Sequence, residues 1–70
     1  MQDYKAYNLR NGWGIECYFY ENPYTGVRRY QIDVIILGLP FKDVRESVVS
    51  YDKDEANRLF KALVEKYRSF

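Results

Sequence analysis

The sequence predicts an α+β fold: a four-stranded antiparallel meander followed by one C-terminal amphipathic helix that packs on one face of the sheet. Two observations predict it. Four segments of alternating or β-branched residues are separated by Asn-Gly, Asn-Pro and Gly-Leu-Pro turns. The segment that follows them, at the end of the chain, has helical periodicity instead. The chain has 70 residues, with no repeat and no linker, so residues 1–70 are expected to form a single domain.

The first hairpin is expected to join strands at residues 4–10 and 13–21 through the Asn-Gly dipeptide at 11–12. Asn followed by Gly readily supplies the two positive φ angles of a two-residue type I′ turn. This turn sets Ala6 opposite Cys17. The face toward the core then carries Tyr4, Ala6, Ile15, Cys17 and Phe19, and the outer face carries Lys5, Tyr7, Glu16, Tyr18 and Tyr20.

The third strand is expected at residues 27–37, after an Asn-Pro-Tyr-Thr-Gly turn at 22–26. Its alternation places one set of side chains toward the core, namely Tyr30, Ile32, Val34 and Ile36. To align this set with the core face of the second strand, Glu21 must pair with Gly26.

Residues 34–37 break the alternation, because all four are apolar. Such a run is typical of a strand that is covered on both faces, and the single helix can cover only one of them. Ile35 and Leu37 are therefore expected to contact a partner, and a second copy of the chain, in a homodimer, is the simplest one.

The fourth strand is expected at residues 44–51, but its facing is ambiguous. One facing is favoured by Val44 and Val48 and the other by Val49 and Tyr51, and a β-bulge would reconcile them.

The helix is expected at residues 53–68. Asp52 followed by Glu55 resembles a capping box, and acidic residues lie in the first turn and basic residues in the last. A single apolar stripe recurs at helical spacing through Ala56, Leu59, Phe60, Leu63, Val64 and Tyr67.

Composition argues against catalysis and against a metal or cofactor site. The chain has no histidine and one cysteine, so the usual general base and the usual metal clusters are missing. Cys17 lies on the expected core face, where a thiol packs as a small apolar group. Glu16 with Asp33, and Asp43 with Glu46, could form carboxylate pairs, but Glu16 and Asp33 share a face with cations, which favours a salt-bridged surface. A lone thiol and no apolar run of membrane length indicate a cytoplasmic protein.

The remaining candidate is a binding face made of aromatic, charged and amide side chains, namely Tyr7, Trp13, Glu16, Tyr18, Tyr20, Arg29 and Gln31. Three interpretations stay open. Tyr and Arg are enriched at protein interfaces, aromatic rings beside cations can stack the bases of single-stranded DNA or RNA, and cross-strand Tyr–Arg pairs also stabilise a sheet without any ligand. The net charge of +1 disfavours a nucleic-acid binder.

The order of four strands and a helix resembles the positive-cofactor-four family of single-stranded-DNA-binding transcriptional coactivators. The matching segments are 12–13 at the start of the second strand, 29–33 in the third and 50–55 before the helix. The resemblance implies a homodimer that binds single strands on a curved, basic sheet. This chain has fewer basic residues in its early strands than that family. A second, weaker resemblance, to the three-stranded arm-site DNA-binding domains of phage-type integrases, rests on the turns at 11–12 and 22–26.

We therefore expect a small, non-enzymatic regulatory or inhibitory module that binds another protein through its outer sheet face. A factor encoded by a phage or mobile element would suit this size. The alternative is a single-stranded nucleic-acid-binding protein that uses the same face.

Overall fold

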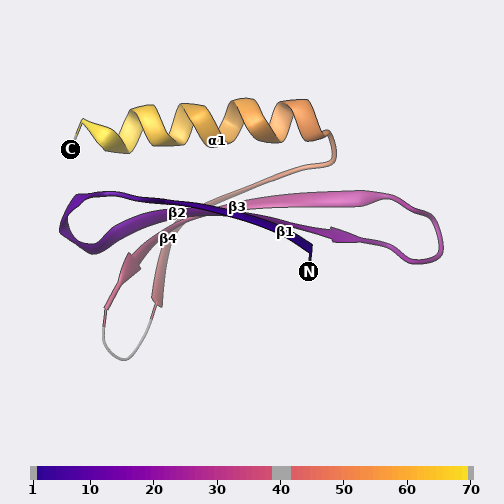
Figure 1. Ribbon diagram of the computed structural model, residues 1–70, viewed down its shortest axis with the longest axis horizontal. Helices are drawn as coiled ribbons and strands as arrows, with labels where there is room; N and C mark the ends of the chain where they lie inside the picture. Colours follow the sequence, from indigo (N-terminus) through magenta and orange to yellow (C-terminus); the bar gives the residue numbers. More distant parts are fainter. Residues whose placement is uncertain (1, 39–41, 70) are drawn as a thin grey trace.

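One antiparallel sheet and one helix make up the part of the chain that the structure describes. The computed structural model describes residues 2–38 and 42–69. Its elements are β1 (Gln2–Asn8), a 3-10 turn η1 (Arg10–Gly12), β2 (Trp13–Glu21), β3 (Arg28–Leu37), β4 (Lys42–Ser50) and α1 (Lys53–Arg68). The strands are adjacent in the order β1-β2-β3-β4, and α1 lies across one face of the sheet (Figure 1). The predicted fold, a four-stranded antiparallel meander followed by a helix, is confirmed.

The helix α1 has the predicted bounds and the predicted cap. The Asp52 carboxylate accepts a hydrogen bond from the Glu55 backbone N–H at 3.1 Å. Ser50, at the end of β4, donates to the Glu55 carboxylate at 2.9 Å and also accepts from the Asp52 N–H. Because these bonds join the last residue of the sheet to the first turn of the helix, they fix the direction in which α1 leaves β4.

Replacing Asp52 by alanine should lower the free energy of unfolding by about 1 kcal/mol, because the first turn loses its side-chain acceptor. Urea denaturation followed by circular dichroism measures this loss. Asp54 lies in the same turn but makes no capping bond, so Asp54→Ala should cost clearly less. Equal losses in the two variants would contradict the assigned cap.

The register of the first hairpin differs from the predicted one by one residue. Lys5 pairs with Cys17, and Tyr7 with Ile15, whereas the two-residue turn placed Ala6 opposite Cys17. The connection is longer than predicted and contains a 3-10 turn, in which the Trp13 N–H donates to the Arg10 carbonyl and Gly12 has φ 79. A hydrogen bond from the Leu9 N–H to the Trp13 carbonyl closes the loop. A one-residue shift turns every side chain of a strand to the opposite face.

Because of this shift, Lys5 and Tyr7 belong to the face that α1 covers, and the prediction that they point outward is wrong. The Lys5 ammonium lies 5.2 Å from the centroid of the Phe60 ring and donates to the Asn57 side chain. Ala6 occupies the outer face instead, in register with Glu16.

The register of the second hairpin differs from the predicted one by two residues, which preserves the faces. Glu21 pairs with Arg28 rather than with Gly26, and Cys17 therefore lies opposite Ile32. The Asn22 side-chain oxygen accepts hydrogen bonds from the backbone N–H groups of Tyr24 and Thr25 in the turn. This Asx-type turn accommodates the longer loop.

A bulge in β4 resolves the ambiguity of its facing. The register shifts between Val34, opposite Glu46, and Ile35, opposite Val44. Because of the bulge at Arg45, Val44 points to the sheet face away from α1, whereas Val48 points to the face that α1 covers. Val48 packs against the core, whereas Val44 and Val49 are about half exposed.

The core lies between the sheet and α1. Its centre is formed by the fully buried Ile15, Ile32 and Val34. Ala56 and Leu63 are the buried residues of the helix, and Phe19 stacks at a tilt against Tyr30, with ring centroids 5.4 Å apart. Of the nine buried apolar residues in the described part, seven lie on strands and two on α1.

Candidate functional site

The sheet face opposite α1, called the outer face below, is the first of two candidate binding surfaces. In Figure 1 the helix lies on one side of the sheet, and no described segment covers the other side. The strand registers define its rows: Ala6–Glu16–Asp33–Ser47 in the centre, Tyr18–Gln31–Val49 on one side with Tyr20–Arg29 beyond it, and Gly14–Ile35–Val44 on the other side.

A hydrogen-bonded network occupies the centre of the outer face. Asp33 is 7% exposed, yet its carboxylate has three donors. One oxygen accepts from the Tyr18 hydroxyl at 2.8 Å, and the other accepts from the Ser47 hydroxyl at 2.7 Å and from the Gln31 amide at 3.1 Å. A carboxylate that accepts three hydrogen bonds holds its neighbours in fixed positions.

The network changes the acidity of Tyr18. Burial and the hydrogen bond donated to Asp33 raise the pKa of Tyr18 from 10.0 to about 12, since both disfavour a tyrosinate beside a carboxylate. A folded-state pKa above the unfolded one stabilises the fold below pH 10.0, and this contribution is lost as the pH rises through about 12.

We therefore expect the wild-type chain to lose more stability than Tyr18→Phe when the pH is raised from about 8 to about 11, because only the wild type has this linkage. Urea denaturation at both pH values measures the difference. Tyr24→Phe, at a side chain that is 95% exposed, is the matched control and should behave like the wild type. A loss that is the same in Tyr18→Phe and in the wild type would contradict the assigned bond.

Five of the seven residues predicted for the binding face lie on the outer face, namely Glu16, Tyr18, Tyr20, Arg29 and Gln31. Tyr7 and Trp13 lie on the helix side. The Trp13 ring stacks on Tyr67 of α1, with centroids 5.6 Å apart.

Ile35 is not the uncovered side chain that the sequence suggested. It is 3% exposed within the single chain, and its Cγ1 would lie 3.7 Å from a Cβ built at Gly14, so Ile35 rests against backbone there. The side chain of Leu37, the other predicted contact, lies outside the described part. The most exposed apolar side chains of the outer face are instead Tyr20, Val44 and Val49, at 55, 52 and 47%.

Several outer-face residues are absent from the predicted binding face, and four of them matter to the argument, namely Asp33, Val44, Ser47 and Val49. The sequence predicts Asp33 on this face but not as a binding residue, and the position of its hydrogen-bond donor Ser47 depends on the β4 bulge. Val49 could be placed only when that bulge was known, since its facing was ambiguous.

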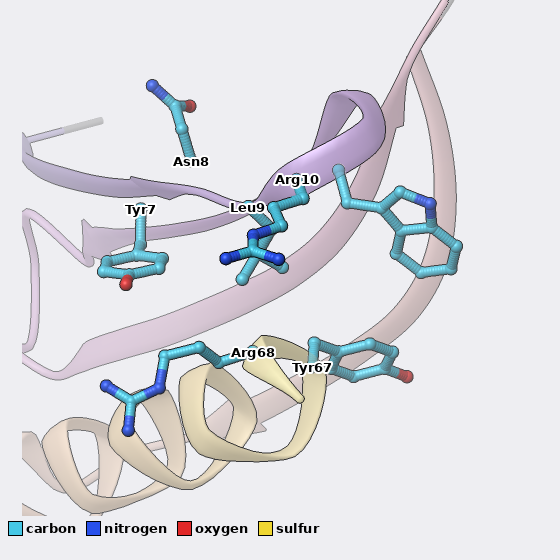
Figure 2. Close-up of a pocket in the computed structure, with 7 residues that line it drawn as sticks. Tyr7, Asn8, Leu9, Arg10, Tyr67 and Arg68 are labelled. Atoms are coloured by element: carbon cyan, nitrogen blue, oxygen red, sulfur yellow. The ribbon is translucent and has the colours of Figure 1, made fainter. Parts of the chain in front are cut away.

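The second candidate is a cavity of about 400 Å³ between the β1–β2 turn and the C-terminal end of α1, called the helix-end cavity below. It is lined by Tyr7, Asn8, Leu9, Arg10, Trp13, Tyr67 and Arg68. Figure 2 shows the side chains of Tyr7 and Arg10 pointing toward the end of the helix, whereas Asn8 points away from it. No motif in the sequence links these segments, and Tyr7 lies on this side of the sheet only because of the observed register of β1.

Cys17 faces the core, as predicted. Burial raises the pKa of the Cys17 thiol, and the nearby Lys5 lowers it by less. Residues 2–38 and 42–69 contain no group of three or more His, Cys, Asp or Glu side chains placed to hold a metal ion. Among the same residues, no helix is both long and apolar enough to cross a membrane.

Comparison of the chain with protein-family models, with curated proteins and with solved structures finds no match in any of the three. The candidate surfaces therefore have to be interpreted from their own chemistry.

Proposed function

We propose that the chain is a small, non-enzymatic regulatory or inhibitory module that binds another protein through its outer face. The observation that carries this proposal is the set of half-exposed apolar side chains, Tyr20, Val44 and Val49, around a rigid polar centre. An interface with an apolar contact region and pre-positioned hydrogen-bonding groups is typical of protein–protein recognition.

The charge of the outer face supports a protein partner over a nucleic acid. Lys5 lies on the helix side and adds no charge to the outer face. Among the described side chains of β1, β2 and β3, the charged groups on the outer face are the carboxylates of Glu16 and Asp33 and the guanidinium of Arg29. Phosphate groups provide much of the affinity of nucleic-acid binders, and two carboxylates would repel them. A protein surface carries no such requirement.

The alternative is a single-stranded nucleic-acid-binding protein, as the resemblance to the positive-cofactor-four family implies. One observation favours it. The exposed Tyr20 lies directly across from Arg29, so that a ring and a cation adjoin on an open surface. Tyr18, by contrast, has its hydroxyl committed to Asp33 and is only partly exposed.

Homodimer formation remains part of the proposal, with the outer face rather than Ile35 as the surface involved. Ile35 needs no second copy for its cover, whereas Tyr20 and Val49 do remain open in the single chain. Sedimentation equilibrium would measure whether the partner is a second copy of the chain.

The proposal is tested by affinity capture with crosslinking in the cells from which the sequence comes, comparing the wild type with the double variant Tyr20→Asp/Val49→Asp. Loss of an aromatic residue that anchors an interface costs about 2 kcal/mol or more, equivalent to roughly 30-fold in affinity. The double variant should therefore lose the proteins captured by the wild type. Tyr24→Asp, in the β2–β3 turn, is the matched control and should retain them.

Equal capture by the wild type and the double variant would show that the outer face is not the binding surface. Titration of a labelled single-stranded oligonucleotide at two salt concentrations tests the alternative. Binding that weakens steeply with salt and disappears in Tyr20→Asp would replace the protein-binding proposal by the nucleic-acid one.

A further inference from the structure

The helix-end cavity differs from the outer face in the charge of its lining. Its described lining includes two arginines, Arg10 from η1 and Arg68 from α1, and no carboxylate. The lining also has the Tyr7 ring, which is partly exposed, from β1. Segments that lie almost the whole chain apart thus bring cations and aromatic rings to one hollow (Figure 2).

The two guanidinium groups differ in how far they are engaged. Arg68 forms an exposed ion pair with Glu65 at 3.1 Å, a type of contact that contributes at most about 1 kcal/mol. Arg10 is exposed and makes no ion pair with another residue of the described part. Both are therefore available to an anion, and a guanidinium can bind a phosphate through two parallel hydrogen bonds.

The aromatic wall of the cavity is held in place. The Tyr67 hydroxyl donates to Glu46 of β4 at 2.6 Å, and the Tyr67 ring stacks on Trp13. The hydrogen bond to Tyr67, together with the charge of Lys66, keeps the pKa of the Glu46 carboxyl below its usual range. This wall is fixed before any ligand arrives, which reduces the entropy lost on binding.

We propose that the helix-end cavity binds a nucleoside phosphate, with the base against the Tyr7 ring and the phosphate between Arg10 and Arg68. Base stacking on an aromatic side chain contributes about 1–3 kcal/mol. A volume of about 400 Å³ lies within the range of small-molecule sites. The partial negative charge of the helix C-terminus opposes an anion there, and the two full positive charges outweigh it.

The protein carries its own reporter for this site. Trp13 is the single tryptophan of the sequence, and it lines the cavity. Titration with each of the four nucleoside 5′-monophosphates should change the Trp13 fluorescence in a saturable way. Adenosine and inorganic phosphate, each tested alone, should bind more weakly than adenosine 5′-monophosphate, because each lacks half of the proposed contacts.

Arg10→Ala and Arg68→Ala should each weaken binding of adenosine 5′-monophosphate about 10-fold or more, since each removes charged hydrogen bonds to the phosphate. Arg58→Ala is the matched control: it removes the same charge from an exposed position of α1 outside the cavity lining, and it should leave affinity unchanged. Thermal unfolding of all three variants should stay close to that of the wild type, because the side chains are exposed.

A 5′-phosphorylated oligonucleotide, compared with its unphosphorylated form and with the free mononucleotide, distinguishes a strand end from a free nucleotide as the source of the ligand. The proposal is overturned if none of the four nucleotides gives a saturable change at millimolar concentration. It is also overturned if phosphate alone binds as tightly as the nucleotides, or if Arg58→Ala weakens binding as much as Arg10→Ala. None of these results depends on the outer face.

Discussion

Replacing Ile32 by alanine should lower the free energy of unfolding by about 2–5 kcal/mol, which is the range for truncating a buried isoleucine. Ile32 is fully buried in the middle of β3, between Cys17 of β2 and Val48 of β4, on the face under α1. A chain of this length is expected to have only about 4–10 kcal/mol of stability in total. The variant should therefore be largely unfolded or melt far below the wild type.

Urea denaturation followed by far-UV circular dichroism measures this loss. Val27→Ala is the matched control, because Val27 is 52% exposed and lies outside the strands, so its truncation should cost no more than about 0.5 kcal/mol. If Ile32→Ala lost less than about 1 kcal/mol, then the site would not be packed as the structure shows.

The helix and the fold class could be predicted from the sequence because their signals are local. The apolar stripe of α1 keeps one period over four turns, and the capping bond joins Asp52 to Glu55, only three residues later. Each of these patterns favours helix whatever the rest of the chain does. Tertiary packing then only had to agree with them.

The register of the first hairpin could not be predicted, because packing outweighs the local preference of the turn. Asn-Gly favours a two-residue turn, but the chain forms a longer one that includes Leu9. Leu9 is partly buried against the core, beside Trp13. Complete burial of a leucine side chain contributes about 1.5–3 kcal/mol. Even partial burial of Leu9 therefore outweighs the local preference of Asn-Gly for a two-residue turn.

The register of the second hairpin was ambiguous for a different reason. A strand alternates with a period of two, so a shift by two residues leaves every side chain on the same face. The faces of Tyr30 and Ile32 were therefore correct, although their cross-strand neighbours were not. The observed register is accompanied by the hydrogen bonds of the Asn22 side chain and by an ion pair between Arg28 and Glu21 at 2.7 Å.

The helix-end cavity shows the limit of sequence patterns for sites. Arg10 and Arg68 are single charged residues in segments 58 positions apart. Neither lies in a recognisable sequence motif. The aromatic ring that adjoins them, Tyr7, is predicted on the opposite face, because the predicted register of the first hairpin is wrong by one residue. A one-residue error in one strand was enough to conceal the site.

Replacing Asp33 by alanine should lower the free energy of unfolding by about 2–3 kcal/mol at neutral pH, because three donors lose their acceptor. Two effects oppose each other at this position. Burial of a carboxylate costs several kcal/mol, whereas hydrogen bonds to a charged group contribute about 1.5–3 kcal/mol each. With the bonds from Tyr18, Gln31 and Ser47 in place, the sum favours the native residue.

Asp33→Asn separates the charge from the geometry. The amide has nearly the same shape and keeps one acceptor oxygen, so that it can retain the bonds from one side of the network, and its loss should be about 1 kcal/mol. Asp43→Ala is the matched control, since Asp43 forms an exposed pair with Arg45 at 3.2 Å and its replacement should cost less than about 1 kcal/mol. If Asp33→Ala were as stable as the wild type in urea denaturation, then desolvation of the carboxylate would cancel the gain from its three bonds, and the predicted loss would be wrong. The outer face would in that case keep a buried charge that adds nothing to stability, as expected of a surface whose rigidity serves binding.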